Sequence, residues 1–259
     1  MAREAIAVSS FTPTLGAHLR LSGCAKRGTN VIAVSRLALI LAIAAFLAGE
    51  SSAQTGPSDD DLRLFAVHIN RTPPPPWSGY GVYLGNGLVL TAAHVPGNVD
   101  QTKPRVLMAG RDLPASLVKR GRLEDIDLTL LSVDPANLPL RWRMSRLPLC
   151  TNNPFAGEAV VVATPEGTAR SRVLPAAAVP RNLRARFDTV IGDVATTGNS
   201  GSGVFDAWKQ CLLGVISRKI SSVGARGLPG QASPKAKDIA KYFVPVHEIN
   251  AFLPVEVSF

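Results

Sequence analysis

The chain has 259 residues, a formal net charge of +9 and 46% hydrophobic residues. This length allows a sizeable core, in one large or two small domains. The basic residues form no Lys/Arg run after the first fifty positions, which argues against nucleic-acid binding. A solvated basic surface that can associate with anionic envelope polymers is favoured instead.

The first fifty residues differ from the rest of the chain. Arg36 is followed by an apolar run over residues 37–48 and then by small residues that end at Ala53. A basic flank, about a dozen apolar residues and small residues at the −3 and −1 positions predict a secretory signal peptide that is cleaved after Ala53. Residues 1–34 form an N-terminal extension ahead of it, for which no structure is predicted. The run is shorter than the ~20 apolar residues of a membrane span, so an uncleaved signal anchor is the alternative.

We therefore expect an exported protein, periplasmic or secreted, with membrane contact only if residues 1–53 stay uncleaved. Cleavage removes five basic and two acidic residues and leaves a net charge of +6. It also removes Cys24, so Cys150 and Cys211 remain as an even pair in an oxidising compartment. The sequence leaves open whether these two cysteines form a disulfide. Without a neighbouring ligand pattern they do not indicate a metal site.

The mature chain opens with a polar segment and then turns to β-type patterns. Residues 54–61 are polar and are predicted to be disordered, and the alternation of apolar residues from 62 to 69 predicts a strand. The prolines at 73–76 favour an extended loop. Residues 80–91 hold two β-type runs around Asn86-Gly87, which is typical of a β-hairpin.

Two polar side chains follow at the ends of predicted strands. His94 comes directly after the hairpin in the string Thr-Ala-Ala-His-Val, where a strand end can hold a histidine with one face open. Further short strands are predicted over 105–108 and 113–119. Asp127 stands immediately before an apolar strand and is expected to be buried, whereas Asp125 can stay in water. A buried carboxylate needs a partner, and a histidine N–H would supply one.

The second half of the chain repeats the β-type pattern. Residues 135–148 are rich in Pro, Arg and Trp and are predicted to cross over between the two halves. Strands are then predicted over 158–164, 172–179, 189–191 and 211–217, and a strand and short amphipathic helix over 242–253. Many short strands with little helical periodicity predict an all-β barrel or sandwich.

Ser200 lies in the stretch Thr-Thr-Gly-Asn-Ser-Gly-Ser-Gly-Val-Phe over residues 196–205. Glycines on both sides suit a tight turn whose backbone N–H groups point the same way as the serine hydroxyl. An acyl-transfer nucleophile and its oxyanion hole need that geometry. Together with His94 and Asp127, in that order along the chain, the sequence offers a base, an acid that orients the base, and a nucleophile.

The strings Thr-Ala-Ala-His-Val (91–95), Asp-Leu-Thr-Leu-Leu (127–131) and Gly-Asn-Ser-Gly-Ser-Gly (198–203) resemble the three signature blocks of the chymotrypsin-like (trypsin-fold) serine proteases. They are most similar to the bacterial glutamyl-endopeptidase and HtrA protease-domain type. The resemblance covers roughly residues 62–255. It implies two antiparallel β-barrels, over 62–145 and 146–259, with a short C-terminal helix and the active site between the barrels.

The resemblance also implies a role for each site residue. His94 would be general base and then general acid, Asp127 would orient it, and Ser200 would form the acyl-enzyme. The N–H groups of Gly198 and Ser200 would form the oxyanion hole. We therefore expect an exported serine endopeptidase that acts on a polypeptide substrate as a monomer, without cofactor or metal.

Substrate contacts follow from the same resemblance. Val194 matches the base of the specificity pocket, and its apolar side chain disfavours cleavage after Lys or Arg. Ser217 matches the family's serine near the buried aspartate. It is expected to be the first residue of the strand that pairs with the substrate backbone. Ile216 stands where acid-specific relatives often carry histidine, so glutamyl specificity is not supported. Arg218 and the lysine after it can still attract acidic substrate. Specificity therefore stays open, with a weak preference for small or apolar side chains.

The sequence departs from the family at two positions and leaves two other functions open. Asn199 replaces the aspartate that captures a new N-terminus in digestive members, so activation by that route is not expected. Gly203 stands where proline is usual. A catalytically idle envelope binding module and a serine esterase are the alternatives. The esterase would need a histidine after the serine, and His247 is the only one.

Overall fold

The computed structural model of the chain describes residues 58–72, 79–193, 198–222 and 237–255. The predicted signal peptide (1–53), the proline loop (73–76) and Val194 lie outside the described residues. The chain divides into two compact units, and the elements described here belong to the unit Thr55–Phe259. In the described part of the chain, no helix is long and apolar enough to cross a membrane.

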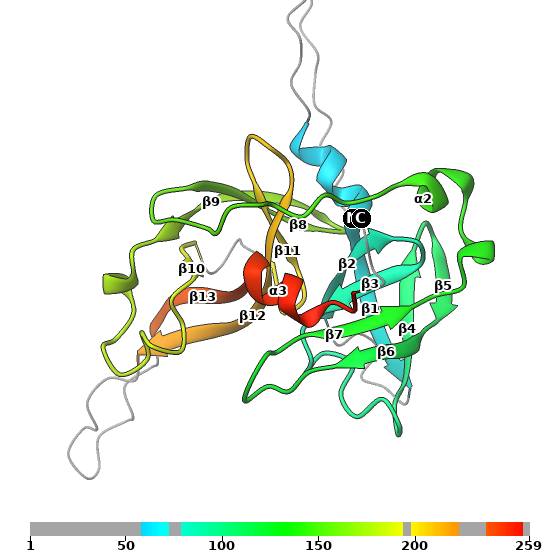
Figure 1. Cartoon of the computed structure of the whole chain (residues 1–259), viewed down its shortest axis with the longest axis horizontal. Coiled ribbons are helices and arrows are strands. Elements are labelled where there is room, and N and C mark those ends of the chain that lie inside the picture. The colour runs from blue at the N-terminus through cyan, green and yellow to red at the C-terminus, as the bar shows by residue number, and fades with distance from the viewer. Residues whose placement is uncertain (1–57, 73–78, 194–197, 223–236, 256–259) are drawn as a thin grey trace, which may run out of the picture. The chain divides into compact units, whose positions relative to one another are not determined.

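Within the described residues, the first half of this unit is one seven-stranded antiparallel sheet, in the order β5-β4-β1-β2-β3-β7-β6 (Figure 1). Its strands are β1 (Ala66–Thr72), β2 (Gly79–Gly85), β3 (Leu88–Thr91), β4 (Lys103–Met108), β5 (Arg111–Pro114), β6 (Ser116–Arg120) and β7 (Thr129–Ser132).

The two outer strands of this sheet, β5 and β6, are consecutive in the chain and are separated by Ala115 alone. The Ala115 N–H donates to the carbonyl of Pro104 in β4 at 3.0 Å. One bent segment therefore supplies both edges, so the sheet has to curve until its edges meet. The strand predicted over 113–119 is correspondingly broken at this bend.

The second half is a closed barrel with the strand order β10-β13-β12-β11-β8-β9, and pairing of Val190 in β10 with Leu174 in β9 completes the ring. Its strands are β8 (Ala159–Thr164), β9 (Gly167–Leu174), β10 (Val190–Ile191), β11 (Gly203–Asp206), β12 (Leu212–Ser222) and β13 (Lys237–Pro245). The all-β, chymotrypsin-like fold predicted from the sequence is confirmed.

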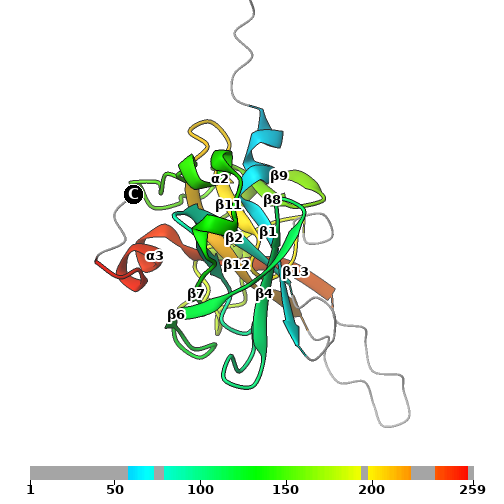
Figure 2. The same cartoon turned by 90° about the vertical axis from the view of Figure 1, so that its right-hand side faces the viewer.

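Short helices connect and flank the two halves. They are η1 (Asp59–Phe65), η2 (Pro135–Asn137), α2 (Leu140–Met144), η3 (Ala176–Ala178) and α3 (Val246–Phe252). The 3-10 helix η1 lies beside β8 and β9 of the second barrel in both views (Figure 1 and Figure 2), where Arg170 of β9 bonds the Asp59 carboxylate at 2.6 Å. The predicted C-terminal helix is present as α3.

One hydrophobic core cluster contains side chains from both halves. Val82, Leu90 and Leu128 of the first half belong to it together with Phe205 and Val215 of the second, and all five are at most 1% exposed. Burial of a fully enclosed aliphatic or aromatic side chain stabilises by about 1.5–3 kcal/mol. The two halves are therefore held together by a shared apolar interior, which positions the residues at their junction.

The predicted hairpin is confirmed, because β2 and β3 pair around a turn in which Asn86 (φ 53°) and Gly87 (φ 78°) both take the left-handed conformation. The strand predicted from Leu62 is wrong in its first part, since Asp59–Phe65 forms η1 and β1 begins at Ala66. Ser58 caps that helix through a reciprocal hydrogen-bond pair with residues 60 and 61. This capping stabilises a helical turn over residues that the alternation of apolar side chains predicted to be a strand.

Two further segments depart from the sequence-based expectation. Residues 59–61 lie in η1, within the 54–61 segment predicted to be disordered. The strand predicted over 172–179 ends at Leu174, and Ala176–Ala178 is a 3-10 turn. Pro175 has no backbone N–H and cannot continue the ladder, which explains where the strand stops.

Cys150 and Cys211 form a disulfide, with their Cα atoms 5.0 Å apart. The bond joins the segment before β8 to the start of β12, where the Cys150 N–H also donates to the carbonyl of Leu212 at 3.0 Å. Both cysteines are buried. The cross-link therefore ties the entry of the second barrel to the strand that carries Ser217.

Reducing this disulfide should lower the stability of the fold. The bond spans a sequence separation of 61 residues, and a loop of this size corresponds to about 4 kcal/mol of unfolding free energy in the chain-entropy description. Urea unfolding with and without reductant measures the difference. The double variant Cys150→Ala/Cys211→Ala is the control and should not respond to reductant. An unfolding midpoint of the unaltered chain that is the same in both conditions would contradict the prediction.

Candidate active site

His94 and Asp127 come from the ends of two neighbouring strands. Pairing of Thr91 in β3 with Thr129 in β7 brings the residues beyond those strand ends together. Nδ1 of His94 lies 2.9 Å from Oδ2 and 3.2 Å from Oδ1 of Asp127. The His94 backbone N–H donates to Oδ1 at 3.3 Å. Because Nδ1 is held by the carboxylate, Nε2 is the ring nitrogen left to exchange a proton with another group.

Asp127 is a buried carboxylate, with 2% of its surface exposed. Ser217 donates its hydroxyl to Oδ2 at 2.5 Å, and Nη2 of Arg218 lies 3.8 Å from the same oxygen. Burial raises the pKa of Asp127. The hydrogen bonds from His94 and Ser217 and the positive charge of Arg218 outweigh burial, so the pKa lies below its ordinary value. Asp127 is therefore ionised at neutral pH, and its negative charge can stabilise a protonated His94.

Ser217 reaches Asp127 because of a β-bulge. The register between β12 and β13 shifts between Ile216 and Arg218, so Ser217 is the extra residue on its strand. Its side chain is fully buried against Asp127. Its backbone carbonyl accepts a hydrogen bond from the Ser200 hydroxyl at 2.9 Å. Ser217 thus contacts both the acid and the serine.

In the turn around Ser200, some backbone N–H groups form hydrogen bonds and others do not. Three N–H groups bond within the turn or to β12: Asn199 to Ser202 Oγ at 3.2 Å, Ser202 to the carbonyl of Asn199 at 3.0 Å, and Gly201 to the carbonyl of Ile216 at 2.7 Å. Among the described residues, the N–H groups of Gly198 and Ser200 have no hydrogen-bond partner. These are the two donors that the sequence predicts for an oxyanion hole.

The first half of the unit also fixes the backbone at Ser200. The Tyr80 N–H of β2 donates to the carbonyl of Ser200 at 3.0 Å. Gly201 has a φ of 90°, and a Cβ there would lie 1.8 Å from the carbonyl oxygen of Tyr80. Only glycine allows both this conformation and this approach. The turn therefore packs backbone to backbone against β2.

In the described residues, no hydrogen bond joins the Ser200 hydroxyl to His94, since the hydroxyl donates to Ser217 instead. The His94 side chain is 35% exposed. The structure brings His94 and Asp127 into direct contact and connects Ser200 to them through Ser217. Arg218 contacts Asp127 and the ring of Phe187, and Val194 is outside the described residues.

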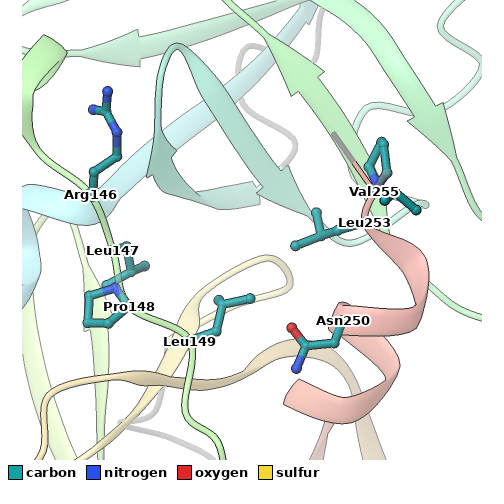
Figure 3. Close-up of a pocket in the computed structure, with 8 residues that line it drawn as sticks. Arg146, Leu147, Pro148, Leu149, Asn250, Leu253 and Val255 are labelled. Atoms are coloured by element: carbon teal, nitrogen blue, oxygen red, sulfur yellow. The ribbon is translucent and has the colours of Figure 1, made fainter. Parts of the chain in front are cut away.

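A 300 Å³ cavity lies beside Ser200 and is lined by Asn199, Ser200, Ile216, Arg218, Lys219, Asp238 and Lys241. A larger cavity of 730 Å³ lies elsewhere, between residues 146–149 and the end of α3. Figure 3 shows Leu149 on the connecting segment facing Asn250 and Leu253. The lining of the larger cavity has neither a nucleophile nor a carboxylate. Of these two cavities, the smaller is therefore the one that can hold a reacting group beside Ser200.

Lys241, which no sequence motif predicts as a site residue, comes from β13 and is 7% exposed. Its Nζ donates to the carbonyl of Gly198, next to Ser200. Burial lowers the pKa of Lys241, and the nearby charge of Lys219 lowers it further. A single cation within the apolar run of residues 239–246 was the available signal. In the described ranges, no group of His, Cys, Asp or Glu could hold a metal ion.

Replacing Ser217 by Ala should raise the pKa of Asp127 and lower the unfolding free energy near neutral pH by about 1–3 kcal/mol, because a buried carboxylate loses a donor. A carboxyl whose pKa is lowered by folding stabilises the fold above its unfolded pKa, and this stabilisation is lost as the pH falls through the folded value. The difference between the two proteins should therefore shrink from about pH 7 to about pH 3 in urea unfolding.

Thr189→Val is the matched control for this variant. The Thr189 hydroxyl donates to the carbonyl of Phe243 at 2.7 Å and is also buried, but its acceptor does not titrate. Its loss should cost about 1 kcal/mol at every pH. A Ser217→Ala difference that stays constant with pH would show that the hydroxyl does not act through the charge of Asp127.

Comparisons with known proteins agree with this architecture. A family model described as "Trypsin-like peptidase domain" matches residues 79–215, a range that includes His94, Asp127 and Ser200. A search of curated protein sequences finds no match.

Among solved structures, the Rv3671c protease from M. tuberculosis in its active form is similar to this chain with a TM-score of 0.53 and 17% identity, over 79% of this chain and 86% of that one. Kallikrein-related peptidase 10 in complex with Zn²⁺ is similar with a TM-score of 0.52 and 16% identity, over 76% and 96% of the two chains. At these identities the likeness shows the fold. With the family match over more than half of its length, the chain belongs to the trypsin-like peptidase domain family.

Proposed function

We propose that the chain is an exported serine endopeptidase that hydrolyses peptide bonds through His94, Asp127 and Ser200. The observation that carries the proposal is the contact of Nδ1 of His94 with the buried carboxylate of Asp127 at 2.9 Å, to which Ser217 also donates. Membership of the trypsin-like peptidase family supports the same reaction. The three motif blocks favour the bacterial glutamyl-endopeptidase and HtrA type. The proposed enzyme acts as a monomer on a polypeptide substrate.

In the acylation step, Oγ of Ser200 attacks the carbonyl carbon of the scissile peptide bond and its proton passes to Nε2 of His94. The imidazolium that forms is stabilised by the ionised, buried Asp127, which also holds the ring in the tautomer with its proton on Nδ1. His94 then gives the proton to the leaving amine as the C–N bond breaks. The acyl group remains on Ser200 as an ester.

The oxyanion of the tetrahedral intermediate needs donors that are not already bonded. The unpartnered N–H groups of Gly198 and Ser200 suit this role among the described residues. One such donor contributes about 10²–10³ in kcat in related acyl-transfer enzymes. In the second step His94 takes a proton from water, the water oxygen attacks the ester carbonyl, and Ser200 leaves with that proton restored.

The reaction requires the Ser200 hydroxyl to leave the Ser217 carbonyl and to reach His94. Catalytic hydrogen bonds are often poorly aligned without substrate and tighten in the substrate complex. The present bond to Ser217 is also the observation that favours the second candidate, a catalytically idle envelope binding module. The esterase alternative has less support, because His247 is exposed on α3 and, within the described residues, forms no hydrogen bond with Ser200.

Ser200→Ala should remove about 10⁶-fold of the peptidase turnover while the fold survives, as removal of the nucleophile does in related chemistry. The unaltered chain should react with a fluorophosphonate probe, whose phosphorus forms a bond to Oγ of Ser200 as fluoride leaves. Peptide hydrolysis and mass spectrometry of the labelled chain measure the two effects. Ser145→Ala is the matched control, because the hydroxyl of this serine donates to the carbonyl of Arg141 in α2 at 2.7 Å and takes no part in the site.

Two outcomes would contradict the proposed triad. Labelling that is absent in the unaltered chain would favour the idle module. Loss of activity in His247→Ala but not in His94→Ala would favour the esterase.

Export is tested by the N-terminus of the mature protein. When the full chain is produced in a bacterium, we expect the exported protein to begin at Gln54, because the small residues before it suit signal peptidase. Ala53→Arg should block this cleavage by placing a bulky charge at the −1 position. N-terminal sequencing of cell fractions measures both. A mature protein that begins at Met1 would mean that the segment is retained.

A further inference from the structure

We propose that the segment connecting the two halves, residues 139–157, and the β11–β12 turn, residues 207–210, form a docking surface for a lipid bilayer with anionic headgroups. The first segment is called the connector below. The inference does not depend on the proposed peptidase reaction, because this surface shares no residue with the cavity beside Ser200. It also goes beyond membrane contact through residues 1–53. The side chains that would contact the bilayer are Leu140, Arg141, Arg143, Met144, Phe155 and Trp208.

The helix α2, at the start of the connector, exposes two large apolar side chains. Leu140 is 64% exposed and Met144 is 72% exposed, and side chains at positions i and i+4 lie on one face of a helix. Trp142 between them is half-buried. Its ring lies edge-on to Tyr83 of β2 with the centroids 5.4 Å apart, and its carbonyl accepts from the Tyr83 hydroxyl at 2.8 Å. The helix is therefore fixed to β2 and holds Leu140 and Met144 in water.

The β11–β12 turn exposes an aromatic side chain in the same way. Trp208 is 82% exposed. The turn around it is held by Asp206, whose Oδ1 accepts from the backbone N–H groups of Trp208 at 2.8 Å and of Lys209 at 2.9 Å. The tryptophan ring is thus presented to solvent by a hydrogen-bonded turn.

The far end of the connector lies beside this turn. The disulfide joins Cys150 to Cys211, which directly follows the turn. On the other side, the N–H of Ala207 donates to the carbonyl of Ala159 at 3.1 Å. Phe155 lies between these two attachment points and is 64% exposed. The connector and the turn therefore form one surface with apolar side chains at both ends.

This surface lies where the described part of the chain begins. Figure 1 and Figure 2 both show α2, η1 and the β11–β12 turn at one end of this unit and β6 at the opposite end. Nε2 of Gln210 donates to the carbonyl of Ser58 at 3.2 Å, and Trp142 lines one cavity together with Arg63 of η1. Residues 49–57 separate Ser58 from the apolar run 37–48. The covalent link to that run therefore leaves the unit at the end that carries the docking surface.

The charge of the connector is complementary to anionic lipid. Residues 139–157 contain Arg141, Arg143 and Arg146 and no Asp or Glu. Within the ranges that the structure describes, no ion pair joins these arginines to a carboxylate. A guanidinium group forms strong, often bidentate hydrogen bonds with phosphate, and basic residues close to an anionic leaflet are attracted to it. The connector therefore offers cations that lipid phosphates can pair with.

The acidic residues of η1, at the same end, do not cancel this charge. Asp59 lies 2.6 Å from Nε of Arg170, and Asp60 lies 3.8 Å from Arg63. Both carboxylates thus have cations of their own beside them. The positive charge of the connector is therefore left largely in place.

The mixture of side chains favours a bilayer over other partners. The core of a protein–protein interface is depleted of charged residues, whereas Arg141 and Arg143 lie among the exposed Leu140 and Met144. An anionic polymer would bind the arginines and gain little from the exposed ring of Trp208. Aromatic and aliphatic side chains beside Arg or Lys are typical of surfaces that lie in the headgroup region of a membrane.

The test is co-sedimentation of the full chain with phosphatidylcholine vesicles, with and without phosphatidylglycerol. Arg141→Gln/Arg143→Gln should weaken partitioning onto the phosphatidylglycerol vesicles by about 20-fold, because each arginine near an anionic surface contributes about fivefold. The same variant should leave partitioning onto pure phosphatidylcholine unchanged. Met144→Ser and Trp208→Ser should each weaken partitioning onto both kinds of vesicle by about fivefold, because less apolar surface leaves water.

The fluorescence of Trp208 gives a second readout that does not depend on how strongly residues 1–53 bind. It is obtained as the difference between the unaltered chain and Trp208→Phe. On phosphatidylglycerol vesicles we expect the emission to shift to shorter wavelength and to be protected from an aqueous quencher, because the ring leaves water. Arg141→Gln/Arg143→Gln should remove the shift.

Val118→Ser and Arg120→Gln are the matched controls, because both residues are exposed on β6 at the opposite end of the unit. Neither should change partitioning or Trp208 emission. Ser200→Ala should bind vesicles like the unaltered chain, so the result is independent of fluorophosphonate labelling. Trp208 emission that does not respond to vesicles overturns the inference. Controls that weaken partitioning as much as the docking variants also overturn it, as does binding of polyphosphate, but not of vesicles, through Arg141 and Arg143.

Discussion

The buried carboxylate of Asp127 is the constraint on which the junction of the two halves depends. It comes from the first half, is 2% exposed, and takes donors from His94 of its own half and from Ser217 of the other. An ion buried without such donors costs several kcal/mol, so docking of Ser217 against Asp127 stabilises the junction of the two halves. The apolar cluster shared by the two halves makes that docking rigid. The chemistry and the packing therefore require the same arrangement.

The position of Ser200 follows from this docking. Its hydroxyl bonds Ser217, which is already held by Asp127, and its carbonyl accepts from Tyr80 of the first half. The backbone approach at Tyr80 is close enough that residue 201 has to be glycine. The serine is thus fixed from both sides. Its own turn leaves two backbone donors unused in the described residues.

The sequence predicted what local chemistry determines. The hairpin followed from Asn86-Gly87, and the burial of Asp127 from its place before an apolar strand. It could not predict features that depend on strand register. The bulge that turns Ser217 toward Asp127 and the pairing of Lys219 with Lys241 arise only when β12 and β13 are aligned. One insertion in that ladder moves every later side chain to the other face, and no local pattern records it.

The charged groups around Ser200 suit the proposed reaction. The ionised Asp127 lies beyond Ser217, and the cavity beside Ser200 is lined by Arg218, Lys219 and Lys241 together with the carboxylate of Asp238. A proton that leaves the hydroxyl toward His94 moves toward the anion, and negative charge that develops on a substrate carbonyl is stabilised by fixed donors and cations. Ser217, placed by the β12 bulge, is the residue that joins the acid to the serine, because it donates to Asp127 and accepts from Ser200.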